Sequence, residues 1–353
     1  MSEESLQERV EALFAAGPER IALTASTGNE DVDAVLKGVV GVFEDVFPGR
    51  VRGYYVVGSY ANGTAVGGSD LDFHPLFKGE FGDGEAVRVY AARDICNGMA
   101  PLELNVDPWP EDFAKAVYSG IFPLVSLPVF GEDIRPSIPL PPLEAYRRRL
   151  VNVGGLLKAR QASSLRFPLA YPEPDDELYG YGRRGVHGPE GPEVQGTRGL
   201  IGVAYSIVLG RLGMDAARYI AGKAEAFALY GERYDDEWAG LANQIWERCR
   251  QDWQYRIPAA ERDREELRAM CRRLLAWENF YLGLYRDFSL KELAAPKVDW
   301  PYGDGDYTAY CLARLESVCF PGDEGVFGAV KPYLSSPNPV WRRAAAKVME
   351  GRR

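Results

Sequence analysis

The fold is decided by residues 57–73, which read VGSYANGTAVGGSDLDF. The apolar run at 51–57 that leads into this stretch predicts a β-strand, and Gly58-Ser59 ends it abruptly. A loop rich in Gly, Ser and Thr follows, and a second strand begins at Asp70. Because successive side chains of a strand point to opposite faces, Asp70 and Asp72 should lie on the same face.

The two neighbouring aspartates predict a cation site. Carboxylates this close repel each other, so the pair is unfavourable unless a cation lies between them. Mg²⁺ suits such a pair, because it binds few carboxylates and leaves positions for water and phosphate oxygens. The glycines allow backbone N–H groups to approach a phosphate, and the Ser59 hydroxyl adds a donor. We therefore expect a nucleotide site; the alternative is a glycine-rich hairpin with two solvated aspartates.

The stretch resembles the motif of the polymerase-β-like nucleotidyltransferase superfamily. The shared pattern is an apolar residue, Gly-Ser, a spacer of ten residues, and then Asp-apolar-Asp-apolar. The resemblance implies two Mg²⁺ ions bound by Asp70 and Asp72, and an NTP, with ATP favoured, as co-substrate. It implies phosphate contacts from Gly58, Ser59 and Ser69.

A third acidic residue is expected on a later strand. Residues 101–107 alternate apolar and polar, which predicts a strand. The run 102–106, LELNV, resembles the strand with the third acidic residue in the aminoglycoside nucleotidyltransferases, the branch that the chain resembles most. This implies that Glu103 is the general base and lies beside the metals as a ligand. Asp107 lies on the same face and precedes a proline, as in other branches, so it is the alternative; an ordinary exposed strand glutamate is the non-functional reading of Glu103.

The length of 353 residues favours two domains, and the pattern of elements predicts the α+β class. Residues 1–141 are interpreted as the nucleotidyltransferase catalytic domain, a small mixed sheet with helices. The proline-rich run 136–142 is interpreted as the linker, and 142–353 as a helical acceptor-binding domain. The elements expected in the first domain are helices at 3–16, 31–45 and 110–119, and strands at 51–57, from 70, and at 86–92, 101–107 and 124–130.

Three features of the second domain bear on the acceptor. A helix is expected at 143–163, and a long loop at 165–195 is either a lid over the acceptor or disordered. Residues 198–249 are similar to the C-terminal helical domain of aminoglycoside adenylyltransferases, which implies that Lys223 reaches the nucleotide phosphates from the start of a helix. A helix N-terminus with an ammonium group is a good anion site, although a first-turn surface lysine is the alternative. The tail at 294–353 is interpreted as a helical extension or an oligomer contact.

Composition limits the partners. The formal net charge of −10 argues against a protein that coats nucleic acid and suits a cationic small molecule. The five cysteines are odd in number and lack zinc-ligand spacing, so we expect reduced thiols in a cytoplasmic protein. The acidic N-terminus lacks an apolar region, which predicts no signal peptide, and no apolar run reaches the length of a membrane span.

The expected activity is therefore Mg²⁺-dependent transfer of an NMP, with AMP from ATP favoured, to a hydroxyl of a small cationic acceptor such as an aminoglycoside. Pyrophosphate is released, and the aminoglycoside branch implies a role in antibiotic resistance. One alternative is a toxin or regulator that modifies tRNA, a protein or a second nucleotide. Another is a catalytically silent nucleotide-binding protein, against which the complete set of Asp70, Asp72 and Glu103 argues.

Overall fold

The computed structural model describes residues 5–170, 177–183, 185–188, 191–215, 218–295 and 298–351. The protein is of the α+β class, as expected. The chain divides into two compact units: Met1–Pro141 with His187–Glu193, and Pro142–Val186 with Val194–Arg353. Within the described ranges, no helix is both long and apolar enough to cross a bilayer.

A five-stranded mixed sheet forms the centre of the first unit. β1 pairs antiparallel with β2 on one side and β5 on the other, and the short strands β3 and β4 lie parallel to β2. The strands are β1 Val51–Val57, β2 Leu71–Phe77, β3 Leu104–Val106, β4 Trp109–Pro110 and β5 Ser126–Gly131. The helices of this unit are α1 Leu6–Arg20, α2 Glu30–Val46, α3 Glu85–Met99, η1 Glu111–Lys115, η2 Val117–Gly120, α4 Phe122–Val125 and η3 Arg135–Ser137.

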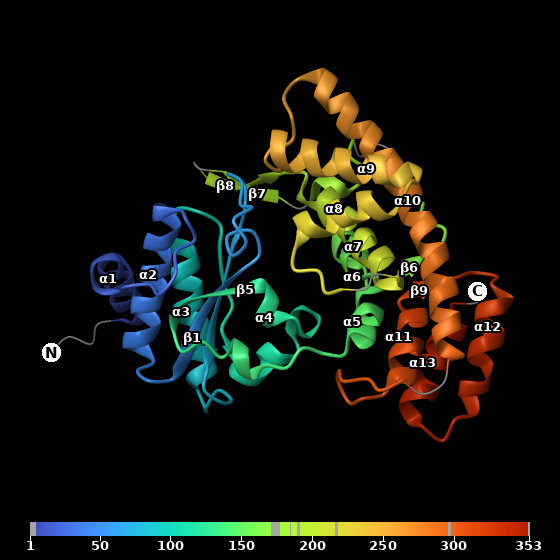
Figure 1. Ribbon diagram of the computed structural model, residues 1–353, viewed down its shortest axis with the longest axis horizontal. Helices are drawn as coiled ribbons and strands as arrows, with labels where there is room; N and C mark the ends of the chain where they lie inside the picture. Colours follow the sequence, from blue (N-terminus) through green and yellow to red (C-terminus); the bar gives the residue numbers. More distant parts are fainter. Residues whose placement is uncertain are drawn as a thin grey trace. The chain divides into compact units, whose positions relative to one another are not determined.

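Helices α2 and α3 cover one face of this sheet, and α1 packs on these two helices (Figure 1). Ser5 and Asn29 cap α1 and α2 by accepting hydrogen bonds from first-turn N–H groups, which satisfies donors that the helix leaves unpaired. The apolar face of α2 meets alternate residues of the strands, such as Val56, Leu71 and Phe73. A smaller core with Tyr55, Val57, Leu76, Trp109 and Phe122 lies on the other face. Both faces of β1 and β2 are therefore buried, apart from the half-buried Arg52 and Asp72.

One local expectation for this unit was wrong, and two were confirmed only in part. The run expected as a strand at 86–92 belongs to α3, because the buried Val89, Ala92 and Cys96 repeat at helical spacing against the sheet. The expected strand at 101–107 pairs only over Leu104–Val106. The expected helix at 110–119 is two short 3₁₀ helices, η1 and η2, and Tyr118 in η2 has a left-handed backbone, with φ 50°.

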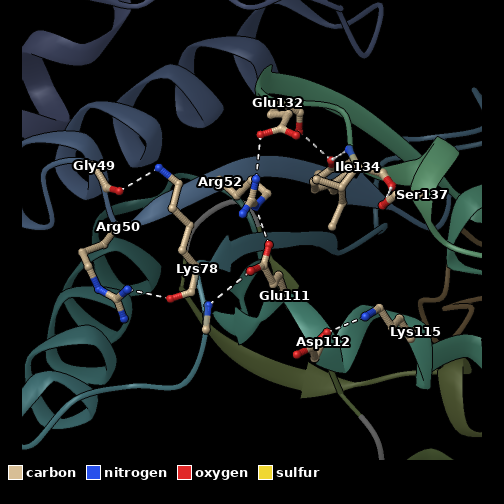
Figure 2. Close-up of polar contacts among 12 residues, drawn as sticks. Gly49, Arg50, Arg52, Lys78, Glu111, Asp112, Lys115, Glu132, Ile134 and Ser137 are labelled. Atoms are coloured by element: carbon tan, nitrogen blue, oxygen red, sulfur yellow. Dashed lines mark hydrogen bonds and ion pairs between the residues drawn. The ribbon is translucent and has the colours of Figure 1, made fainter.

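A polar network fixes the start of β1, away from the Gly58 turn. Arg52 on β1 donates to Glu132 after β5 at 2.9 Å and also to Glu111 in η1 (Figure 2). Glu111 in turn accepts from the backbone N–H of Gly79 after β2, at 3.3 Å. The side chain of Lys78 donates to the carbonyl of Gly49, 2.8 Å away. These bonds tie the three central strands together at this end of the hairpin.

The remaining elements are mainly helical. They are α5 Leu143–Leu150, α6 Gly154–Arg160, β6 Leu165–Arg166, η4 Tyr181–Arg183, β7 Gly185–Gly188, β8 Gly191–Gln195, α7 Arg198–Asp215, α8 Lys223–Arg233, α9 Glu237–Ile245, the π-helix η5 Trp246–Asp252, α10 Glu261–Leu293, α11 Tyr307–Glu316, β9 Val318–Cys319, α12 Glu324–Val330, η6 Lys331–Ser335 and α13 Pro339–Glu350. The helix expected at 143–163 is interrupted at 151–153, so it forms α5 and α6. The tail after 298 is helical, whereas its role as an oligomer contact stays a prediction.

The segment expected as a long loop at 165–195 contains regular structure. β6 pairs with β9, β7 pairs with β8, and η4 lies between them in sequence; residues 171–176, 184, 189 and 190 lie outside the described residues. Tyr181 of η4 donates to the fully buried carboxylate of Glu278, which also accepts from Arg160 at 2.5 and 2.7 Å. The ion pair joins α6 to α10, and the hydrogen bond from Tyr181 anchors η4 to the same carboxylate of α10.

Candidate functional site

The two halves of the 57–73 motif meet at the end of β1. The antiparallel register places Val57 opposite Asp72. The next residue, Gly58, has φ +74°, a left-handed conformation that favours glycine. A Cβ at Gly58 would lie 3.4 Å from Oδ2 of Asp72. The glycine therefore keeps open the space beside this carboxylate.

The turn between the strands holds the two predicted serines differently. Ser59 is half-buried, and its carbonyl accepts a hydrogen bond from the N–H of Thr64 at 2.9 Å. Ser69 is buried, and its hydroxyl oxygen accepts from the N–H of Val66 at 2.9 Å. The Ser69 side chain thus closes the turn, whereas Ser59 follows Gly58 directly at the end of the strand.

The parallel strand β3 continues the polar face of β2. Its register puts Asn105 directly opposite Asp72, and the Asn105 amide donates to Oδ1 of Asp72 at 3.2 Å. Because Leu104 and Val106 point into the helix-side core, the alternating residues Glu103, Asn105 and Asp107 belong to the same face as Asp72. The cross-strand neighbour of Asp72 is therefore an amide, which the sequence-based reasoning missed.

The candidate acidic residues are spread along this face. The carbonyl of Glu103 accepts from the N–H of Leu71 at 2.9 Å, whereas the N–H of Asp107 donates to the carbonyl of Phe73 at 2.8 Å. Glu103 thus lies at the Asp70 end of β2, and Asp107 lies further along. In the part of the chain that the structure describes, no three Asp, Glu, His or Cys side chains gather closely enough to hold a metal ion by themselves.

The residues nevertheless fit Mg²⁺ in one particular way. Mg²⁺ usually keeps several waters and is held by one or two carboxylates together with substrate phosphates. Asp72 on β2 and Asp70, directly before that strand, are both half-buried, and the open space at Gly58 adjoins Oδ2 of Asp72. This donor set matches an ion shared between the protein and a phosphate, without a third protein carboxylate.

His74 extends the same face by one more alternate position and was also missed. It is buried, and its ring stacks on Trp109 with centroids 3.7 Å apart. Its Nδ1 lies 3.1 Å from the carbonyl oxygen of Asp107, and its Nε2 lies 3.2 Å from the hydroxyl of Tyr118. Burial lowers the pKa of His74 to about 4. The signal in the sequence was the period-two series Asp70, Asp72, His74.

A cavity of about 390 Å³ adjoins these side chains, entirely within the first unit. The residues that line it come from β2, α3, β3, β4 and η2: Asp72, His74, Arg93, Asp94, Asn97, Asn105, Val106, Asp107, Trp109 and Tyr118. Arg93 pairs with Asp94 at 2.7 Å, and the side-chain oxygen of Asn97 accepts from the N–H of Val106 at 3.0 Å. The cavity therefore begins at one of the predicted ligands and continues away from Asp70.

Lys223 belongs to the second unit and is the first residue of α8, as expected. Its ammonium lies 5.9 Å from the centre of the Tyr205 ring. Glu225 in the first turn of the same helix accepts from the backbone N–H of Ala221 at 2.7 Å. The start of α8 thus combines a lysine with a helix N-terminus, and its contact with a nucleotide stays a prediction.

Comparisons of the chain with protein-family models, with curated proteins and with solved structures found no match in any of the three. The chemistry open to the site therefore follows from its own residues: a left-handed glycine beside one of two aspartates, an amide on that aspartate, and a neutral histidine behind a cavity.

Proposed function

We propose that the protein is a Mg²⁺-dependent nucleotidyltransferase that moves an NMP, with AMP from ATP favoured, to a hydroxyl of a small acceptor. The observation that carries this proposal is the position of Gly58 beside Oδ2 of Asp72. At Gly58 a phosphate can approach the backbone closely. The carboxylate of Asp72 lies beside this position and can share a cation with that phosphate. The resemblance of residues 57–73 to the nucleotidyltransferase motif points to the same chemistry.

Each motif residue has a role in this proposal. Gly58 and Ser59 bind the β- and γ-phosphates, Ser69 keeps the turn closed around them, and Asp70 and Asp72 hold the metal. Bound Mg²⁺ would supply charge neutralisation of the triphosphate. Lys223 is assigned to the departing pyrophosphate.

The reaction itself is an in-line displacement. The acceptor oxygen forms a bond to the α-phosphorus, the bond from that phosphorus to the pyrophosphate oxygen breaks, and the acceptor proton passes to Glu103. Asp107 is the alternative base. Positioning and charge neutralisation supply most of the acceleration, because no covalent enzyme intermediate is formed.

Charge favours a cationic acceptor, such as an aminoglycoside. The chain has a formal net charge of −10. The cavity wall holds Asp72, Asp94 and Asp107, and its arginine, Arg93, is already paired with Asp94. A cation would therefore be attracted to this wall more strongly than an anion.

The proposal is tested by transfer of label from α-³²P-ATP, with Mg²⁺, to a panel of aminoglycosides and to total tRNA. We expect label on an aminoglycoside and release of pyrophosphate. Asp72→Asn should abolish transfer while the protein stays folded, and Asp83→Asn, at an exposed turn position, is the matched control. Label on tRNA or on the protein itself would indicate a toxin or regulator. Absence of both label and pyrophosphate, or full turnover by Asp72→Asn, would overturn the assignment.

A further inference from the structure

The hydrogen bonds of His74 determine which of its nitrogens carries the proton. The carbonyl of Asp107 can only accept, so Nδ1 of His74, which lies 3.1 Å away, must donate to it. The ring is buried against Trp109, and both of its hydrogen-bond partners, a carbonyl and a phenol, are uncharged, so it fits a neutral imidazole whose Nε2 is the acceptor. The hydroxyl of Tyr118, 3.2 Å from Nε2, therefore donates its proton to His74. The lone pairs of the Tyr118 oxygen remain available as acceptors.

The backbone holds Tyr118 in this place by an unusual turn. Tyr118, Ser119 and Gly120 have φ values of 50°, 58° and 81°, a run of left-handed residues. Such a backbone conformation is unfavourable for residues other than glycine, and it persists where contacts with the surrounding structure determine it. Here those contacts are the edge-on packing of the Tyr118 ring against His74 and its tilted packing against Trp109, each with centroids 6.3 Å apart. The turn thus keeps a half-exposed tyrosine at the cavity.

The cavity wall presents hydrogen-bond acceptors. Tyr118 contributes its oxygen, and Asp72 and Asp107 contribute carboxylates. Burial, followed by the charges of three nearby aspartates, raises the pKa of Tyr118, so the phenol stays protonated and is no general base. Arg93 is paired with Asp94, which leaves the wall acidic. A ligand that fits this wall must bring donors.

We propose that this cavity is the acceptor subsite of the transferase, and that Tyr118 is a specificity-determining residue within it. Its oxygen accepts a hydrogen bond from a hydroxyl or ammonium group of the acceptor molecule. His74 is a positioning residue, because it holds the phenol proton away from the cavity. This inference rests on the proposed function, because only a transferase has an acceptor. Binding of a ligand in the cavity can be tested separately, without turnover.

Histidine NMR gives a direct readout, since the chain contains only two histidines. The full chain, labelled with ¹⁵N-histidine and saturated with Mg²⁺ and a non-hydrolysable ATP analogue, is titrated with an aminoglycoside, with spermidine and with inositol. We expect the His74 spectrum to show the Nδ1–H tautomer. At least one of the three probes should bind and shift the Nε2 resonance of His74, and His74→Asn identifies that resonance.

Two variants separate recognition from structural support. Tyr118→Phe should weaken binding of that probe about tenfold, the effect of one lost hydrogen bond, with unchanged affinity for ATP and Mg²⁺. His74→Asn should weaken it to a similar extent, and the double variant should lose little more, because both changes remove one interaction. A merely structural role for His74 would instead give additive losses. Tyr333→Phe, in the other compact unit, is the matched control for removal of a hydroxyl.

The outcomes distinguish this inference from the proposed function. It is overturned if no probe binds, if binding leaves the His74 resonance unmoved, or if Tyr118→Phe binds as tightly as the wild type. If the protein binds a probe through Tyr118 but transfers no label, the proposed transferase activity is wrong and the proposed binding site stands. If the wild type and Tyr118→Phe transfer label equally well, the proposed transferase activity stands and its acceptor binds elsewhere.

Discussion

The side-chain amide of Asn105 donates a hydrogen bond to Oδ1 of Asp72 across the parallel strands β2 and β3, at 3.2 Å. Oδ2 of the same carboxylate is the oxygen nearest to the Gly58 position. One bond thus orients the carboxylate, so that its other oxygen faces the turn where a phosphate is expected. This arrangement gives the amide a defined role: it holds Asp72 in place without adding negative charge.

Asn105→Asp tests whether the site gains from a third carboxylate. The change replaces a donor with an anion opposite Asp72, so repulsion should destabilise the metal-free protein and raise the pKa of the pair. A divalent cation should relieve this repulsion, and we expect an affinity for Mn²⁺, followed by electron paramagnetic resonance, about tenfold higher than that of the wild type. Asn243→Asp, at an exposed position of α9, controls for the added charge. Unchanged Mn²⁺ affinity would argue against a cation at Asp72.

Gly58→Ala tests the phosphate approach. The left-handed conformation should cost about 1 kcal/mol of unfolding free energy once a Cβ is present. Gly63 is a matched control, because its φ of +69° is similar but a Cβ there would meet nothing within 4 Å. We expect both variants to lose similar stability in urea unfolding, and only Gly58→Ala to lose ATP binding in calorimetry. Equal ATP affinity in the two variants would separate Gly58 from the phosphate site.

The hairpin at the centre of this site could be predicted because its signals are local. The apolar run at 51–57, the Gly58-Ser59 break and the period of two at Asp70 and Asp72 lie within a stretch of sequence short enough to specify a hairpin. The structure bears out that antiparallel pairing. The position of Lys223 at the start of α8, which the family resemblance implied, also agrees with the structure.

The residues that were missed depend on distant pairing. Asn105 meets Asp72 only because β3 aligns in parallel with a strand more than thirty positions earlier, and α3 intervenes. That register is set by burial of Leu104 and Val106, which the order of residues alone does not reveal. The left-handed Tyr118 has no local sequence signal either, since its ring contacts with His74 and Trp109 determine it.

Glu103→Gln and Asp107→Asn separate the two candidates for the general base. We expect Glu103→Gln to lower the rate of label transfer about a hundredfold or more with ATP binding preserved, because only the proton acceptor is lost. Asp107→Asn should have a much smaller effect, since the contacts of Asp107 with Phe73 and His74 are made by its backbone. The measurements are single-turnover transfer and ATP calorimetry. The reverse order of effects would make Asp107 the base, and loss of ATP binding in Glu103→Gln would make Glu103 a metal ligand.

The buried His74 should make the stability of the protein depend on pH. Its pKa is lowered from 6.5 to about 4 by burial, so between these values the unfolded chain binds a proton that the folded chain does not. The contribution of His74 to the free energy of unfolding is therefore fully present above pH 6.5. It is lost as the pH drops toward 4, and the loss is about 3 kcal/mol at most. The His74→Gln variant has no titratable side chain at position 74. It keeps the carboxylates and His187, so their contributions to the pH dependence of stability cancel when the two proteins are compared. We expect urea unfolding to show the wild type losing more stability than His74→Gln between pH 7 and pH 4.5. Parallel losses in the two proteins would mean that His74 has the same pKa in the folded and the unfolded chain.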